Sequence, residues 1–167
     1  MPDVVIHHLY RSPGHDFFGR HGLPPGRHGV EECESVDLVA GSGIRGDRFF
    51  DYKPDYKGQI TFFDQAIVEA VRLHAGNPAL PASAFRRNVV VEGIDLNSLI
   101  RQRFTLGGIL FEGMAECSPC HWMDMACGKP GVEALLKSRG GLRCRILQDG
   151  VLRKGPATLD ITDLRLL

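Results

Sequence analysis

Apolar residues fall in short runs along the chain, and glycine (20) and proline (10) separate these runs throughout. This spacing of turn-forming residues favours short strands over long helices. Residues 89–91 are three consecutive valines, whose β-branched side chains suit a pleated surface. We predict strands at residues 4–9, 31–39, 58–63, 88–92, 103–106, 109–115, 142–148 and 151–153.

Two segments show a helical pattern. Asp64 can cap a helix over residues 65–75, in which Ile67, Val71 and His74 fall on one face and Gly76 ends the helix. A second helix is predicted from Pro130 to residue 139, because proline suits the first helical turn. Leu135 and Leu136 would face inward there, and Gly140 would end the helix.

The remaining segments predict turns and loops. Asp149-Gly150 lies between two apolar runs and predicts a two-residue β-hairpin. Residues 10–29, rich in glycine, proline and histidine, predict a long loop of the kind that is functional or mobile in compact domains. Strands in runs with two helices between them do not give the alternation of a parallel sheet. We therefore predict a mainly β protein with a few helices, built as a closed or nearly closed mixed barrel.

Length and charge limit the functions to consider. The 167 residues fit a single domain, 1–167, with 43% hydrophobic and 24% charged residues. Twenty basic and twenty acidic residues cancel, so no overall field favours nucleic acid or an anionic membrane. No run approaches a membrane span, and the N-terminus lacks a secretion signal. Five cysteines, an odd number, indicate reduced thiols in the cytoplasm rather than a disulfide framework.

The densest chemistry lies at Cys117-Ser118-Pro119-Cys120-His121. The string matches the c-type haem attachment signature, but no export signal accompanies it. A second possibility is a dithiol redox pair, but the usual βαβ context is missing. A third is a zinc site, with ligands from Cys117, Cys120 and Cys127 and either Cys144 or His121. Zinc sites usually have a second closely spaced pair of ligands, and the sequence has none. The simplest alternative is a set of small, soft residues at a strand end, and for Cys33, Cys127 and Cys144 we favour it.

Three basic segments are candidates for anion binding. Residues 43–49 (GIRGDRF) place two glycines around a turn, where Asp47 could accept a hydrogen bond from Arg48. Arg86-Arg87-Asn88 precedes the valine strand, and two planar guanidinium groups there suit phosphate. Arg143-x-Arg145 alternates along a strand, so both side chains share one face.

Together these segments resemble the MOSC domain, named after the C-terminal domain of molybdenum-cofactor sulfurase. The resemblance runs in order through residues 43–49, Gln59-Ile60-Thr61, 86–96 (RRNVVVEGIDL), 104–107 (FTLG), Pro119-Cys120, 142–147 (LRCRIL) and 149–150. It implies a strand-rich barrel in which Cys120 is the characteristic cysteine. In amidoxime-reducing relatives that cysteine ligates molybdenum, and in cofactor sulfurases it is thought to carry sulfur as a persulfide.

From the resemblance we expect a protein that binds the molybdenum cofactor (Mo-molybdopterin) with Cys120 as metal ligand and catalytic residue. The expected cofactor-binding residues are Asp47, Arg48, Arg86, Arg87, Asn88 and Arg145. The activity would be reduction of N-hydroxylated compounds. Because the chain lacks the N-terminal barrel extension and the ferredoxin-like domain of some larger members, the electrons would come from a separate donor protein.

Two other activities remain open. The first is a sulfur carrier or cofactor-delivery module without turnover, which would need a sulfur-donor protein. The second is a dithiol oxidoreductase that uses Cys117 with Cys120. Pyridoxal phosphate, often attached to the family, is not expected in this chain, which has no aminotransferase-like domain. In each case the thiolate would react, and His121 with Arg48, Arg86 or Arg87 would lower the pKa of Cys120.

Overall fold

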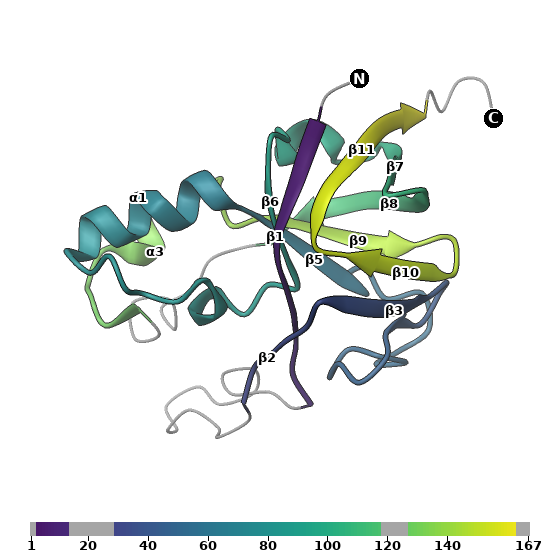
Figure 1. Cartoon of the computed structure of the whole chain (residues 1–167), viewed down its shortest axis with the longest axis horizontal. Helices are drawn as coiled ribbons and strands as arrows, with labels where there is room; N and C mark the ends of the chain where they lie inside the picture. Colours follow the sequence, from purple (N-terminus) through teal and green to yellow (C-terminus); the bar gives the residue numbers. More distant parts are fainter. Residues whose placement is uncertain (1–2, 14–28, 118–126, 163–167) are drawn as a thin grey trace.

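The computed structural model describes residues 3–13, 29–117 and 127–162, and its main body is a closed seven-stranded β-barrel (Figure 1). The strands follow the order β11-β7-β8-β9-β5-β6-β1, and a β11–β1 pairing closes the barrel. Only β5 and β6 pair in parallel within this barrel, so it is mixed. Its strands are β1 (Asp3–Arg11), β5 (Ile60–Asp64), β6 (Val89–Glu92), β7 (Arg103–Leu106), β8 (Ile109–Glu116), β9 (Leu142–Ile146) and β11 (Gly155–Thr162).

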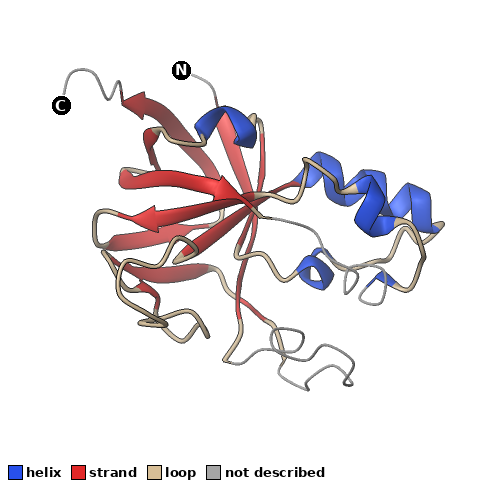
Figure 2. Cartoon of the chain, turned by 180° about the vertical axis from the view of Figure 1, so that it is seen from behind, coloured by secondary structure: helices blue, strands red, loops and turns tan. Residues whose placement is uncertain are grey.

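Smaller elements surround the barrel. Strands β3 (Ser35–Val39), β4 (Gly43–Ile44) and β10 (Gly150–Arg153) form a second sheet, and β2 (Glu31–Glu32) pairs with the end of β1. Helices α1 (Gln65–Ala75) and α3 (Val132–Leu135) gather on one side of the strands (Figure 2). Two short 3₁₀ helices, η1 (Ala82–Phe85) and η2 (Leu96–Leu99), precede and follow β6.

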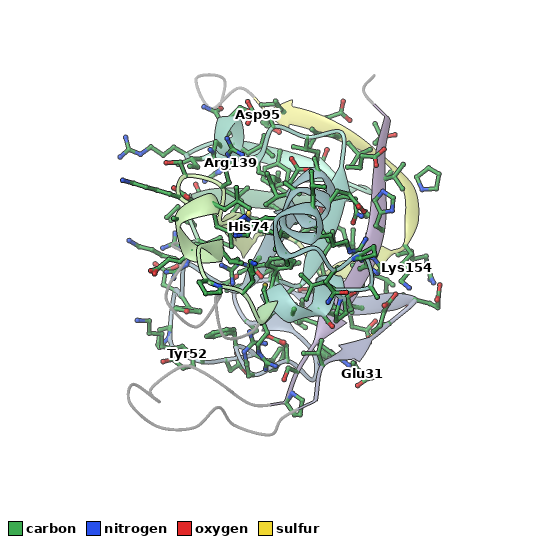
Figure 3. All side chains as sticks on the ribbon, turned by 90° about the vertical axis from the view of Figure 1, so that its left-hand side faces the viewer. Glu31, Tyr52, His74, Asp95, Arg139 and Lys154 are labelled. Carbon is green, nitrogen blue, oxygen red and sulfur yellow. The ribbon has the colours of Figure 1, made fainter. Side chains whose placement is uncertain are left out.

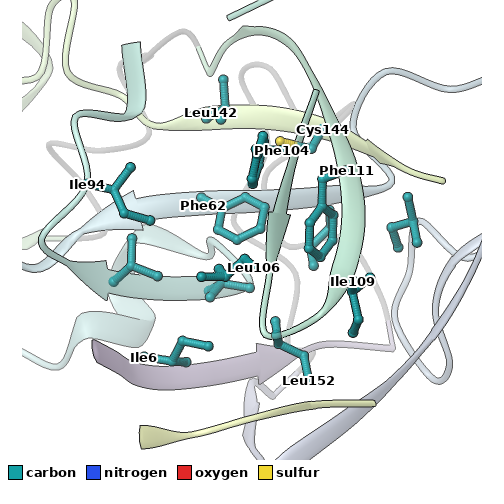
Figure 4. Close-up of a cluster of buried hydrophobic side chains, with 14 of the residues drawn as sticks. Ile6, Phe62, Ile94, Phe104, Leu106, Ile109, Phe111, Leu142, Cys144 and Leu152 are labelled. Atoms are coloured by element: carbon teal, nitrogen blue, oxygen red, sulfur yellow. The ribbon is translucent and has the colours of Figure 1, made fainter. Parts of the chain in front are cut away.

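Two apolar clusters lie on opposite sides of the barrel wall. The interior is filled from all sides, with Phe62, Phe104 and Phe111 at its centre (Figure 4). Their ring centroids are 5.4–6.0 Å apart, in edge-to-face and stacked contacts that aromatic pairs favour. The second cluster, which includes Phe63 and Phe85, packs the outer wall against the helices. Phe62 and Phe63 are consecutive on β5 and belong to different clusters, because neighbouring residues on a strand point to opposite faces of the sheet.

Most predicted elements are confirmed. The mainly β barrel is as expected, and α1 has the predicted bounds. Asp64 Oδ1 accepts a hydrogen bond from Ala66 N at 2.9 Å, and Gly76 ends the helix with a positive φ of 62°. Val68 and Val71 are the buried residues of α1, whereas His74 binds the Pro130 carbonyl instead of facing the core.

Four details of the prediction are wrong. The segment 31–39 forms two strands, Tyr10 and Arg11 belong to β1 rather than to a loop, and the helix predicted over 130–139 is only the short α3. The Asp149-Gly150 turn does not form a hairpin, and neither residue has a positive φ. Both edges of β9 are already paired, with β8 and β5, so β10 pairs with β3 instead. Strands β4 and β11 were not predicted.

No helix among the described residues is long and apolar enough to cross a membrane.

Candidate functional site

A small concave surface on the outer wall of the barrel brings together four separate stretches of sequence. It lies where β1 ends and β6 begins, beside the loop that follows β4. The empty space within it is about 150 Å³, including the part open to solvent. Its lining residues are Tyr10, Arg11, Ser12, Val30, Arg48, Arg86, Arg87 and Asn88. We call these eight residues, together with Asp47 beneath them, the arginine site.

The Asp47 carboxylate is the centre of the arginine site. Its side chain is fully buried, and Oδ1 accepts hydrogen bonds from Ser12 N at 3.0 Å and Arg48 Nη1 at 3.4 Å. Asn88 Nδ2 donates to the same oxygen at 3.5 Å, and Phe49 N donates to Oδ2 at 3.2 Å. A buried carboxylate is stable only when it is paired in this way. Asp47 therefore orients Arg48, as the sequence predicted.

Arg48 and Arg86 contact each other through the backbone. Arg48 Nη2 donates to the Arg86 carbonyl at 3.2 Å, and its guanidinium lies 4.8 Å from the centre of the Phe49 ring. Arg86 has the left-handed backbone conformation, with φ 55° and ψ 34°, and its Nη2 donates to Ser12 Oγ at 2.8 Å. A non-glycine residue in this region is strained by about 1 kcal/mol or more, and such strain concentrates at functional sites.

Arg87 links the arginine site to the segment that leads to Cys120. Its Nε donates to the Gly140 carbonyl at 2.9 Å, and Nη1 donates to the Phe85 carbonyl at 3.1 Å. The same turn holds the end of β8, because Cys117 N donates to the Gly141 carbonyl at 2.8 Å. Gly141 has a φ of 105°, and a Cβ there would lie 2.3 Å from the carbonyl oxygen of Phe62. The turn is therefore fixed closely against the barrel.

Asn88 joins β6 to β5 and β1 at the floor of the arginine site. Its Oδ1 accepts from Thr61 N at 2.9 Å, and the Thr61 hydroxyl lies 3.0 Å from both this oxygen and Asn88 N. Its Nδ2 donates to the Tyr10 carbonyl at 3.1 Å. Nearly all the polar atoms of this buried amide are satisfied by the fold, so its first role is to hold three strands in register.

Arg145 lies apart from the arginine site. It is on the outer face of β9, where Nη2 contacts Asp55 Oδ2 at 3.0 Å and Nη1 lies 3.6 Å from Glu112 Oε1. Glu112 also faces Arg103, which is its partner across β7 and β8. The four charges form a row that attaches the loop after β4 to the barrel. Arg143 shares this outer face, as predicted, because Leu142 and Cys144 face the interior.

Cys120 and His121 lie outside the described residues, so their predicted roles stay predictions. Cys117, Cys127 and Cys144 are buried, and burial raises the pKa of the Cys144 thiol well above its ordinary value. The Cys144 thiol is therefore poorly reactive at neutral pH. In residues 3–13, 29–117 and 127–162, no three histidine, cysteine or acidic side chains are grouped to hold a metal ion.

The MOSC domain model matches residues 28–157, which is most of the chain. This chain belongs to the MOSC domain family. The YuaD protein of Bacillus subtilis has a similar structure, with a TM-score of 0.73 and 18% identity over 95% of each chain. YiiM of Geobacillus stearothermophilus is similar with a TM-score of 0.65 and 15% identity, over 95% of this chain and 74% of that one.

YiiM of Escherichia coli gives a TM-score of 0.61 and 16% identity, over 90% of this chain and 69% of the other. At these identities the likeness establishes the fold of the MOSC chain and no more. A comparison with curated protein sequences gives no match.

Several residues of the site were not predicted from the sequence. Ser12 and Tyr10 reach the arginine site from the end of β1, and Thr61 reaches it from β5. None belongs to a charged motif, so only strand pairing could have placed them there. Thr61 lies in the segment 59–61 that carried part of the MOSC resemblance, which was the one available signal.

Proposed function

We propose that this MOSC protein binds the molybdenum cofactor, with its phosphate held at the arginine site and Cys120 as the metal ligand. The observation that supports the proposal best is the convergence of Arg48, Arg86 and Arg87 on one small concave surface. These arginines come from two loops that are distant in sequence. Their relative placement is maintained by Asp47, which is buried and has no direct access to solvent.

The chemistry of these donors fits a phosphate. Guanidinium groups present planar, permanently charged donors that match phosphate oxygens. The recess itself is shallow, because the empty space of about 150 Å³ includes the part open to solvent. A phosphate would lie over the guanidinium groups at the protein surface, and the larger ring system of a pterin would extend beyond the recess. Thiolate sulfur from Cys120 would supply a soft ligand for molybdenum.

In the proposed activity the bound cofactor would supply two-electron redox chemistry for the reduction of N-hydroxylated compounds. The protein's own residues have simpler tasks. Arg48 and Arg86 bind the anionic end, Asp47 and Ser12 orient these two arginines, and Arg87 holds the turn that carries the end of β8. Electrons would come from a separate donor protein. Arg145 is not included, because its guanidinium is already engaged by carboxylates on another face.

The decisive experiment measures molybdenum and pterin in protein made by a host that synthesises the cofactor. We expect both in the wild type, loss of molybdenum in Cys120→Ala, and at least about a tenfold fall of pterin in Arg48→Gln and Arg86→Gln, since one charge-assisted hydrogen bond contributes about 1.5–3 kcal/mol. Arg153→Gln is the matched control, an exposed arginine on β10. Wild-type protein without pterin, prepared in that host, would contradict the proposal.

The same preparations test the sulfur-carrier alternative. Intact-protein mass spectrometry would then show a gain of one sulfur atom that disappears in Cys120→Ala, without stoichiometric molybdenum. Cys117→Ser separates both functions from a dithiol mechanism, which requires two thiols. For this substitution we expect unchanged cofactor content.

A further inference from the structure

A second recess lies where the parallel strands β5 and β6 end, and it is larger than the arginine site. Its empty space, including the part open to solvent, is about 450 Å³, three times the 150 Å³ of the arginine site. Unlike the arginine site, it has room inside for the centres of water-sized groups. Its lining residues are Asp64, Ile67, Asp95, Leu96, Asn97, Ser138, Arg139 and Gly141. We call these eight residues the charged cavity, and none of them lines the arginine site.

The direction of the strands explains why these residues meet. Because β5 and β6 are parallel, both strands end at the same edge of the sheet. Asp64 is the last residue of β5, and Asp95 follows Glu92, the last residue of β6, by three residues. The arginine site lies where β6 begins, and the four residues of this strand span about 13 Å at ~3.3 Å each. The charged cavity is therefore a separate site.

The walls of the charged cavity are fixed by the fold. Asn97 Nδ2 donates to the Ser138 carbonyl at 2.9 Å and joins η2 to the turn before β9. Asp64 Oδ1 is held at the start of α1 by its capping bond, and Gly141 lies directly against the Phe62 carbonyl. A ligand would enter a recess that is already formed, which lowers the cost of ordering the site.

Arg139 and Asp95 are exposed side chains of opposite charge that line this cavity without a partner from the chain. Neither makes a side-chain hydrogen bond or an ion pair with any other residue that the structure describes. Figure 3 labels both on the side of the molecule that faces the viewer. Further acceptors are Asp64 Oδ2 and Asn97 Oδ1, which the capping bond and the bond to Ser138 do not use. The cavity therefore offers both a cation and a carboxylate to a ligand.

We propose that the charged cavity binds a small zwitterion, an α-amino acid with an apolar side chain. Arg139 binds the carboxylate of the ligand, because a planar guanidinium matches carboxylate oxygens. Asp95 binds the ammonium group, with Asp64 on the same cavity wall, and Ile67 and Leu96 supply apolar surface for the side chain. A simple cation would leave the arginine without a partner, and a simple anion would leave the carboxylates without one. This binding is independent of the molybdenum cofactor.

Three related compounds test the two ends of the ligand separately at about pH 7. Leucine carries both charges, leucinamide carries the ammonium without a carboxylate, and N-acetylleucine carries the carboxylate without an ammonium. Their dissociation constants are measured by NMR titration of the isotopically labelled full chain. Because hydrogen bonds between charged groups are the strong ones, we expect leucine to bind roughly tenfold more tightly than either derivative, a difference of about 1.4 kcal/mol. The shifted backbone signals should be those of residues 95–97 and 138–141.

Two substitutions should act on different compounds. Arg139→Gln removes the partner of the carboxylate, so it should weaken leucine and N-acetylleucine several-fold and leave leucinamide unchanged. Asp95→Asn removes the partner of the ammonium group, so it should weaken leucine and leucinamide several-fold and leave N-acetylleucine unchanged. Lys137→Gln and Asp160→Asn are the matched controls, exposed charges that do not line the cavity, and they should change none of the three constants.

Three results would overturn the proposal. The first is wild-type protein that shows no saturable binding of leucine at millimolar concentrations. The second is equal affinity for leucine and either derivative, since the cavity would then recognise only one charge. The third is a set of shifted signals confined to Arg86, Arg87 and Asn88, which would place the ligand at the arginine site. Molybdenum and pterin content, measured separately, tests the proposed function and is unaffected by any of these results.

Discussion

Replacing Asp47 with alanine removes the acceptor for four donors at once. These are the backbone N–H groups of Ser12 and Phe49, the Arg48 guanidinium and the Asn88 amide, at 3.0, 3.2, 3.4 and 3.5 Å. The Asp47 side chain is fully buried and that of Arg48 only 11% exposed, so water cannot easily replace the lost acceptor. The substitution removes this shared acceptor from a buried position beside the strands that meet there.

The expected destabilisation follows from these contacts. Breaking a buried ion pair by removing one partner costs about 3–5 kcal/mol. Each buried donor left without an acceptor costs about 1–3 kcal/mol, but contributions within one network do not add fully. We therefore expect Asp47→Ala to lower the free energy of unfolding by about 4 kcal/mol. For a domain of this size, that corresponds to a fall in Tm of roughly 8–16 °C.

Urea unfolding followed by circular dichroism measures the change, with the slope against urea checked for constancy. Asp55→Ala is the control, because Asp55 also pairs with an arginine but its side chain is 77% exposed. An exposed pair contributes about 0–1 kcal/mol, so the control should change stability little. A loss below about 1 kcal/mol in Asp47→Ala would refute the view that this carboxylate organises the site.

Three further predictions concern other parts of the molecule. Gly141→Ala forces a Cβ to within 2.3 Å of the Phe62 carbonyl at a φ of 105°, so thermal unfolding should show a loss of more than about 3 kcal/mol. Arg86→Gly relieves the strained φ of 55° but removes a guanidinium, so titration should show lost phosphate binding with stability changed by less than about 1 kcal/mol. The hydrogen bond from Lys154 lowers the pKa of Glu32. The stability that this pair contributes is therefore present at neutral pH and is lost as the pH falls below 4.5, the ordinary pKa of glutamate. In Lys154→Gln, the free energy of unfolding should fall less steeply with decreasing pH in that range.

Matched variants test each of these predictions. Gly29→Ala adds a methyl group where no atom lies within 4 Å, and it should leave stability unchanged. Arg101→Gly relieves a similar positive φ of 65° on an exposed residue, and it should preserve phosphate binding. The pH prediction is contradicted if the wild type and Lys154→Gln lose stability in parallel as the pH falls below 4.5.

Local patterns in the sequence were sufficient for most of the individual elements. The bounds of α1 follow from Asp64 and Gly76, because capping depends only on residues within one turn. The valine run gives β6 for the same local reason. Strand β11 was missed because its sequence, GPATLDIT, has few apolar residues, and Leu159 is the only one of its eight residues that is buried. The Asp149-Gly150 turn was misread because the pairing of β9 depends on strands far away in the chain.

Sequence patterns alone were enough to predict the family, the class of fold and four of the residues that meet at the arginine site, Asp47, Arg48, Arg86 and Arg87. Which of the arginines lie together depends on the folded chain. Arg143 and Arg145 have the same sequence context and share one face of β9, yet the pairing of strands and the position of Asp55 neutralise only the second. Ion pairing depends on distances of a few ångströms between segments many residues apart, and that information arises only when the barrel closes.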